Sequence, residues 1–270
     1  MNDEQPNETA VFENYWRRVR DVLGLSASKR RSFIKDESID LIKRDWRTFD
    51  GKQAVQCLFE SLESKGWQKT PGANWVWREK HTKPSRKNDS QEVLLEHKII
   101  ELGGQRWTRQ VSTASGVDTG PDGKRTRSNR RRSIDLVYDQ GDGGFSFVEL
   151  KVGSDSPIYA LFEILGYGLA YWHSRQEKSN HHPDASRLMQ AKKIDLVVLG
   201  PTSWYQDTPH DIATLAEQLN RGLAELTQGE FPIRCCHTDY PLDVSNNTAN
   251  MAIAAITNLA CKSNETPHES

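Results

Sequence analysis

Apolar residues recur along this chain with two different periods. In some stretches they return every three or four residues, as on one face of a helix, whereas in others β-branched and aromatic residues form short runs between turn residues, as in strands. The helical period predicts helices at residues 11–25, 38–47, 53–65, 91–102, 158–172, 211–226 and 250–261. The short runs predict strands at residues 106–113, 133–139, 145–152, 193–200 and 231–239. From residue 91 to residue 239 the elements therefore follow the order α-β-β-β-α-β-α-β.

Residues 1–85 form a helical N-terminal region that ends in a hairpin. A Pro-Gly pair between Trp67 and Trp77 predicts the turn of this hairpin, and the polar segment 81–90 is typical of a linker. Helices followed by a hairpin fit a small winged-helix-like module, and they fit equally an extension that packs on the domain that follows. Trp75 and Trp77 share one face of a strand, and aromatic pairs of this kind belong to cores more often than to base-stacking platforms. We therefore favour the packed extension.

Composition narrows the class of protein and its compartment. The 270 residues carry a net charge of −1 and 36% hydrophobic residues, and eight Trp and eight Phe supply enough apolar volume for a core. No apolar run approaches the length of a membrane span, and the acidic N-terminus is unlike a signal peptide. The four cysteines show no disulfide framework, which favours the reducing cytoplasm. Cys235 and Cys236 are adjacent in a predicted strand, so we expect half-buried thiols on opposite faces rather than metal ligands.

The two strands at 133–139 and 145–152 carry the most informative polar residues. A Gly-Asp-Gly-Gly run between them predicts a tight hairpin turn. Asp135 interrupts the first strand, and Glu149 and Lys151 interrupt the second. Because side chains alternate between the faces of a strand, Glu149 and Lys151 point the same way, and the hairpin brings Asp135 alongside them. Two carboxylates and an ammonium within a sheet are costly unless they serve each other or a metal.

This cluster has two interpretations: a salt-bridge cluster at a sheet edge, or part of a catalytic site. The Asp/Glu-x-Lys tripeptide alone is weak evidence, because it also occurs at residues 50–52, 63–65, 96–98 and 122–124. Those copies lie in polar turns or on helical patterns, where acid–base neighbours are usually solvated. Glu149 alone lies in an apolar strand whose hairpin partner supplies a second acid. We therefore favour the catalytic interpretation.

The arrangement resembles the PD-(D/E)XK nuclease superfamily, which has the restriction-endonuclease-like fold. Thirteen residues separate Asp135 from Glu149-Leu150-Lys151, and Glu163 precedes Tyr167 by four residues on the following helix, as in many members. Ile134 stands where the family pattern has Pro. The resemblance covers roughly residues 90–239. It implies an α/β domain at 90–262 with a mixed sheet, an αβββαβ core and flanking helices. The polar tail at 263–270 is expected to be disordered.

The resemblance also implies a metal site and roles for its residues. Mg²⁺, with Mn²⁺ as a substitute, would be bound by the side chains of Asp135 and Glu149 and the backbone carbonyl of Leu150. Lys151 would orient or deprotonate the attacking water or stabilise the charge of the transition state. The remaining implied members are Glu163 and Tyr167 near the site, and either Glu92 or Glu96 as a third acid, between which the sequence does not decide.

A basic segment precedes the strand that carries Asp135. The loop at 114–132 ends in six basic residues within nine and contains no acid among those nine: Lys124, Arg125, Arg127, Arg130, Arg131 and Arg132. Blocks of like charge are usually solvated, but a basic loop next to a phosphodiester site is suited to capturing a polyanion. We favour the functional interpretation of this loop. For the basic segment at 27–33 and the His181-His182 pair we favour solvated positions.

Together these features predict a Mg²⁺-dependent nuclease that hydrolyses phosphodiester bonds in nucleic acid, with DNA the favoured substrate. A homodimer is compatible with this function, because enzymes that cut both strands often need two copies of a site. The alternative is a nucleic-acid-binding or scaffold protein that keeps the fold without turnover. The complete set of Asp135, Glu149 and Lys151 argues against that alternative, because degenerate sites commonly lose a member.

Overall fold

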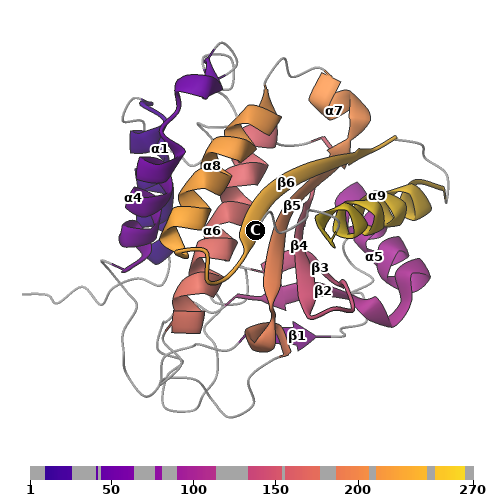
Figure 1. Cartoon of the computed structure of the whole chain (residues 1–270). Coiled ribbons are helices and arrows are strands. Elements are labelled where there is room, and N and C mark those ends of the chain that lie inside the picture. Colours follow the sequence, from indigo (N-terminus) through magenta and orange to yellow (C-terminus); the bar gives the residue numbers. More distant parts are fainter. Residues whose placement is uncertain are drawn as a thin grey trace, which may run out of the picture.

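The computed structural model describes residues 10–25, 41, 44–63, 77–80, 90–113, 133–153, 156–176, 187–206, 211–241 and 247–264. Its centre is a mixed sheet of six strands in the order β1-β2-β3-β4-β5-β6, with helices on both faces (Figure 1). The strands are β1 Arg78–Lys80, β2 Trp107–Ser112, β3 Ser133–Asp139, β4 Gly144–Leu150, β5 Lys193–Pro201 and β6 Ile233–Tyr240. The predicted α/β class with a mixed sheet is confirmed.

The sheet combines antiparallel and parallel pairs of strands. The pairs β1–β2, β2–β3 and β3–β4 are antiparallel, whereas the pairs β4–β5 and β5–β6 are parallel. The connection from β3 to β4 is a tight turn in which Gly141 and Gly143 have φ of 90° and 89°, values that suit glycine. Parallel neighbours need a crossover, and the helices α6 Pro157–Gln176 and α8 Ile212–Leu226 provide the two crossovers.

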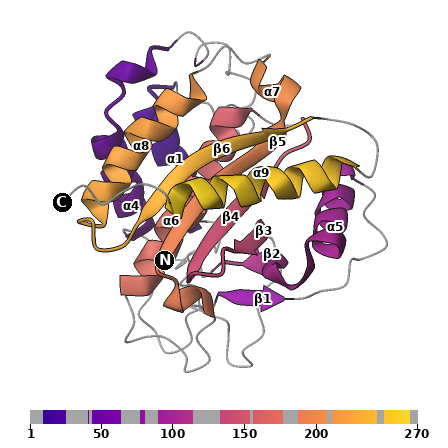
Figure 2. The ribbon, with the colours of Figure 1, turned by 45° about the vertical axis from the view of Figure 1, so that its right-hand side comes forward.

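The helices form one layer on each face of the sheet (Figures 1 and 2). On one face α6 and α8 lie next to α1 Ala10–Val22 and α4 Gly51–Glu63, and the other face carries α5 Gln91–Gly103 and α9 Asn247–Asn264. Each layer has its own apolar core: Phe147 belongs to the first, and Val148, its neighbour in β4, belongs to the second. All seven residues of β4 are buried, which makes it the central strand.

The described N-terminal helices are part of the first layer. Helix α1 crosses α6, where the Tyr15 hydroxyl donates to the Phe162 carbonyl oxygen at 2.6 Å and Trp16 stacks on Tyr159 with ring centroids 4.7 Å apart. Gly166 makes this approach possible, because a Cβ there would lie 2.9 Å from the Tyr15 ring. Strand β1 extends the sheet next to β2, and Trp77, directly before it, is buried with its ring 5.4 Å from that of Tyr171.

Several element boundaries differ from the predicted ones. Residues 46 and 47, expected at the end of the helix 38–47, belong instead to the 3-10 turn η1 Trp46–Thr48, which the Asp45 side chain caps by accepting from the Arg47 N–H. The last helix, α9, is longer than predicted at both ends, and it includes residues 263 and 264 of the expected tail. The short elements η2 Gly104–Arg106, η4 Arg187–Gln190 and α7 Thr202–Gln206 were not foreseen. The Pro-Gly turn of the N-terminal hairpin lies outside the described residues.

Candidate functional site

The β3–β4 hairpin brings together the three residues that the sequence singled out. Leu136 pairs with Val148 across the hairpin, and the backbone N–H of Leu150 donates to Asp135 Oδ2 at 3.0 Å. On β4 and directly after it, Lys151 Nζ lies 2.7 Å from Glu149 Oε1. Both strands therefore direct their polar side chains to one place, at the carboxyl end of β4.

Helix α6 adds a third carboxylate to this place. Glu163 Oε2 lies 3.3 Å from Lys151 Nζ, so one ammonium is shared by two glutamates. Glu149 and Lys151 are only 4% and 6% exposed, whereas Asp135 is half-buried. The second carboxylate oxygen of Glu149, Oε2, is buried and has no hydrogen-bond partner in the described part of the chain. Buried carboxylate oxygens usually have a donor, and a bound water, a bound ion or a catalytic role is the common explanation where they have none.

The backbone of Lys151 is fixed from two neighbouring strands. Its N–H donates to the Leu199 carbonyl oxygen of β5 at 2.9 Å, and its carbonyl oxygen accepts from the Tyr240 hydroxyl of β6 at 2.9 Å. Sequence reasoning missed Tyr240, because the predicted strand ended one residue before it. The only available signal was a tyrosine at the end of a strand, which by itself points to nothing in particular.

Helix α5 contributes two further acids, as the resemblance implies for one of them. Glu96 is 2% exposed, and both of its carboxylate oxygens accept from Gln110 Nε2 at 3.2 Å. Glu92, one turn earlier, is half-buried. Both raise the pKa of Asp135, with Glu96 the stronger influence. We call these six side chains, which are linked by hydrogen bonds, ion pairs or their electrostatic effect on Asp135, the acidic cluster: Glu92, Glu96, Asp135, Glu149, Lys151 and Glu163.

The acidic cluster holds more negative charge than its burial favours. Burial, and then the neighbouring carboxylates, raise the pKa of Asp135 and of Glu149 well above ordinary values. Burial raises the pKa of Glu96 to about 7, although Gln110 and the charge of Arg109 act in the opposite direction. Burial alone would lower the pKa of Lys151, but the carboxylates around it raise the pKa, so Lys151 is an ammonium.

Leu150 and Tyr167 lie close in sequence to residues of the acidic cluster. Leu150 is buried, and its N–H holds Asp135 as described above. Tyr167 lies one turn after Glu163 on α6 and is 5% exposed, and its ring contacts Phe12 of α1 with centroids 5.9 Å apart. The N-terminal helix α1 therefore packs directly behind the part of α6 that carries Glu163.

The acidic cluster fits a hard divalent cation in the chemistry of its donors. Mg²⁺ takes oxygen ligands and commonly uses only one or two protein carboxylates together with water. Asp135 and Glu149 supply two, and Glu149 Oε2 has no donor among the described residues. No group of three or more Asp, Glu, His or Cys side chains within the described residues is arranged to hold a metal ion. Asp135 and Glu149 are thus the residues of the acidic cluster that could hold such a cation.

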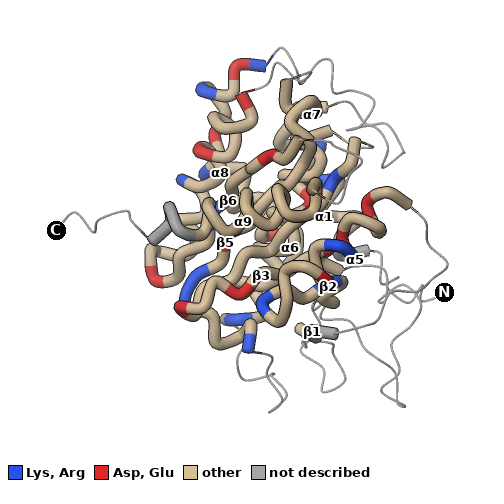
Figure 3. Tube along the Cα trace, turned by 90° about the vertical axis from the view of Figure 1, so that its right-hand side faces the viewer, with Lys and Arg blue, Asp and Glu red and all other residues tan. Residues whose placement is uncertain are grey.

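The basic residues expected to bind nucleic acid, Lys124 to Arg132, lie outside the described residues, as do residues 27–33 and the His181-His182 pair. Over the described chain, acidic and basic positions are interspersed (Figure 3), which agrees with a net charge of −1. Cys235 packs in the layer of α6 and α8 and Cys236 against the layer of α5 and α9, as the alternation of a strand predicts. None of the described helices has the length and apolarity that crossing a membrane requires.

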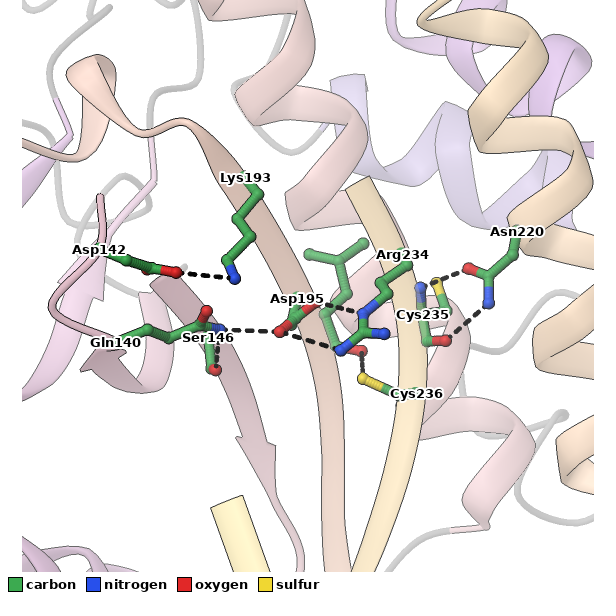
Figure 4. Close-up of polar contacts among 10 residues, drawn as sticks. Gln140, Asp142, Ser146, Lys193, Asp195, Asn220, Arg234, Cys235 and Cys236 are labelled. Atoms are coloured by element: carbon green, nitrogen blue, oxygen red, sulfur yellow. Dashed lines mark hydrogen bonds and ion pairs between the residues drawn. The ribbon is translucent and has the colours of Figure 1, made fainter. Parts of the chain in front are cut away.

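Another buried carboxylate, that of Asp195, lies near the amino end of β5, away from the acidic cluster (Figure 4). Asp195 Oδ1 accepts from Arg234 Nε at 2.5 Å, and Asp195 Oδ2 accepts from Gln140 Nε2 at 2.7 Å. Gln140 Nε2 also donates to Ser146 Oγ at 3.0 Å. We call Gln140, Ser146, Asp195 and Arg234 the Asp195 network. It joins the β3–β4 turn to β5 and β6, and both carboxylate oxygens of Asp195 have donors.

Comparisons of the chain with models of protein families, with curated proteins and with solved structures find no match in any of the three. Inference about function therefore depends on the residues of the acidic cluster and on their geometry.

Proposed function

We propose that this chain is a nuclease that depends on a divalent metal, Mg²⁺ or Mn²⁺, and hydrolyses phosphodiester bonds in nucleic acid. The observation that carries the proposal is the acidic cluster itself: buried Glu149 has a carboxylate oxygen without a donor in the described chain, next to a second acid and an ammonium. A purely structural ion pair would be expected to satisfy both oxygens of a carboxylate this deeply buried. The surplus of negative charge supports a cation as the missing partner.

The side chains have distinct roles in this proposal. Asp135 and Glu149 would hold the cation, which would act as a Lewis acid and lower the pKa of a bound water. Lys151 is an ammonium between Glu149 and Glu163, so it would donate to the attacking water or to a phosphoryl oxygen rather than accept a proton. Glu163 would keep the Lys151 amine in place. In the hydrolysis a bond would form between the water oxygen and phosphorus while the bond from phosphorus to the leaving oxygen breaks. The attacking water would give up a proton to bulk water, and the leaving oxygen would take one from it.

The element order supports the restriction-endonuclease-like fold as the specific architecture. The helix α5, the three antiparallel strands β2, β3 and β4, the helix α6 and the parallel strand β5 follow the αβββαβ order of the PD-(D/E)XK superfamily. DNA is the favoured substrate. Its binding segment would be residues 124–132, which carry six basic side chains and directly precede the strand of Asp135. A homodimer is part of the proposal where both strands of a duplex are cut.

The test is a cleavage assay with circular and linear DNA and with RNA, in Mg²⁺ or Mn²⁺, with and without a chelator. We expect the wild type to cleave only with metal, and Asp135→Asn, Glu149→Gln and Lys151→Met each to lose about a thousandfold or more of the rate, because each removes a group that acts on the reacting atoms. Glu217→Gln, a change in an exposed ion pair on α8, is the matched control and should cleave like the wild type.

Two results would overturn the proposal. The first is full activity in any one of the three cluster variants while the protein stays folded. The second is nucleic-acid binding by the wild type without cleavage in any metal, which would favour the non-catalytic alternative. Thermal unfolding of every variant separates loss of function from loss of the fold.

A further inference from the structure

Gln110, in β2, has a backbone conformation that its residue type rarely adopts. Its φ is 49°, and among the described residues other than glycine the only other positive φ is that of Gln228, at 53°. Its neighbours Arg109 and Val111 pair with Leu136 and Ile134 of β3, so the residue of β3 that lies between these partners is Asp135. A left-handed residue inside a paired strand is costly, and such residues concentrate at functional sites.

The strand turns at Gln110. Trp107 packs in the layer of α5 and α9, whereas Val111 packs in the layer of α6 and α8, although an undistorted strand would place residues four apart on the same face. The pairing of β1 with β2 is also irregular here, since Arg78 lies opposite Ser112 and Lys80 opposite Arg109. Irregularities of this kind re-aim a side chain, and they occur next to active sites more often than elsewhere in sheets.

The re-aimed side chain joins two parts of the structure. Gln110 Nε2 donates to both oxygens of Glu96 at 3.2 Å, and Gln110 Oε1 accepts from Ser133 Oγ at 2.6 Å. Ser133 is the first residue of β3, two residues before Asp135. Gln110 therefore links the Glu96 carboxylate of α5 to the strand that carries Asp135. These hydrogen bonds fix the orientation of the Gln110 amide.

We propose that Gln110 is a positioning residue of the candidate active site: its left-handed backbone aims the amide so that the Glu96 carboxylate stays next to Asp135, and this placement sets the affinity for the divalent cation. This inference rests on the proposed function. Beyond the gathered acids, a second observation points to a ligand: Glu149 Oε2 is buried and has no hydrogen-bond donor among the described residues. Partners that orient the groups around a metal commonly change its affinity by ~10–100-fold when they are removed.

The test measures Mn²⁺ binding without substrate, from the loss of the electron paramagnetic resonance signal of free Mn²⁺ on titration with protein. Gln110→Gly removes the amide and suits the positive φ, and Gln110→Met removes the amide at similar side-chain length. We expect both to weaken Mn²⁺ binding by about tenfold or more. Gln228→Gly is the matched control, because it relieves the same backbone conformation at an exposed residue after α8, and it should bind Mn²⁺ like the wild type.

A double-mutant cycle with Glu96→Ala shows whether Gln110 acts through Glu96. We expect Gln110→Met to weaken binding no further in the Glu96→Ala background, because the group that it positions is then absent. Wild-type affinity in folded Gln110→Gly and Gln110→Met would overturn the role of Gln110 and leave the nuclease proposal intact, and so would additive losses in the cycle. A wild type that binds no Mn²⁺ and cleaves nothing would overturn both proposals.

Discussion

The acidic cluster and the Asp195 network place buried carboxylates at opposite ends of the same parallel strands. The two regions differ in how many hydrogen-bond donors they supply to those carboxylates. Asp195 has one guanidinium and one amide, which together give donors to both of its oxygens. In the acidic cluster one ammonium serves Glu149 and Glu163, and Glu149 Oε2 is left without a donor in the described chain. Burial and neighbouring acids also raise the pKa of Asp135 and of Glu149.

Under the proposed function, this difference separates a structural use of buried charge from a functional one. A satisfied buried pair adds specificity to the fold, because removing either partner leaves the other uncompensated. A surplus of like charge costs stability, and it persists where a ligand or a reaction needs it. Changes in the Asp195 network should therefore lower the stability of the fold, whereas removing charge from the acidic cluster should leave stability equal or higher while function is lost.

The largest stability effect that we expect comes from Glu96 and depends on pH. Because the folded protein holds its pKa at about 7 against 4.5 for an ordinary glutamate, the folded state binds more protons than the unfolded state between these values. The free energy of unfolding should therefore fall as pH rises from 4.5 to above 7. Glu96→Gln has no carboxyl group to titrate at this position. Its free energy of unfolding should therefore exceed that of the wild type by up to about 3 kcal/mol as the pH rises across that range.

Urea unfolding at a series of pH values between 4 and about 8, without metal, measures this difference. Glu217→Gln, on the exposed face of α8, serves as the control and should follow the wild-type profile. Parallel profiles of unfolding free energy against pH for Glu96→Gln and the wild type would mean that burial does not raise the pKa of Glu96. The contrast between the acidic cluster and the Asp195 network would then weaken.

A smaller effect of opposite sign is expected in the Asp195 network. Asp195→Ala leaves the Arg234 guanidinium without its acceptor, leaves Gln140 Nε2 with Ser146 Oγ alone, and should lower the free energy of unfolding by about 2 kcal/mol. The loss is smaller than for a fully buried pair because the Arg234 side chain is 38% exposed. Asp195→Asn keeps an acceptor oxygen and should lose less. Chemical denaturation gives these values.

The rate of cleavage per folded molecule tests whether Asp195→Ala affects function as well as stability. Asp195→Ala should keep the wild-type rate at temperatures where it is folded, because its network lies at the other end of β5 from the acidic cluster. A variant that stays as stable as the wild type but stops cleaving would reverse the assignment of the two regions.

The smallest effect is expected at the rim of the network. Asp142 Oδ2 lies 3.0 Å from Lys193 Nζ, with side chains 42% and 20% exposed, so solvent screens the pair. Asp142→Asn keeps an oxygen to accept from the Gly144 N–H and should cost only about 0.5 kcal/mol, and less in high salt. Denaturation at low and at high salt checks this. A loss of unfolding free energy as large as that of Asp195→Ala would show that side-chain exposure does not predict the strength of this ion pair.

The sequence predicted most of the fold and the centre of the candidate site. The bounds of β3 are those predicted, and the turn glycines and the alternation in β3 and β4 bring Asp135 next to Glu149 and Lys151. These features are local, because a period of two and a turn chemistry are properties of neighbouring residues. Helix α9 was predicted too short, since its small residues give only a weak apolar periodicity.

The sequence by itself therefore determined the elements, their order and the hairpin that carries the central acids. Only the tertiary structure decided that Glu96 is more deeply buried than Glu92, that the Tyr240 hydroxyl holds Lys151, and that Gln110 leaves the strand conformation to contact Glu96. Each of these contacts joins segments from separate elements. Periodicity describes which face of an element is apolar, but which elements meet, and at which residue, is settled only when the whole chain packs.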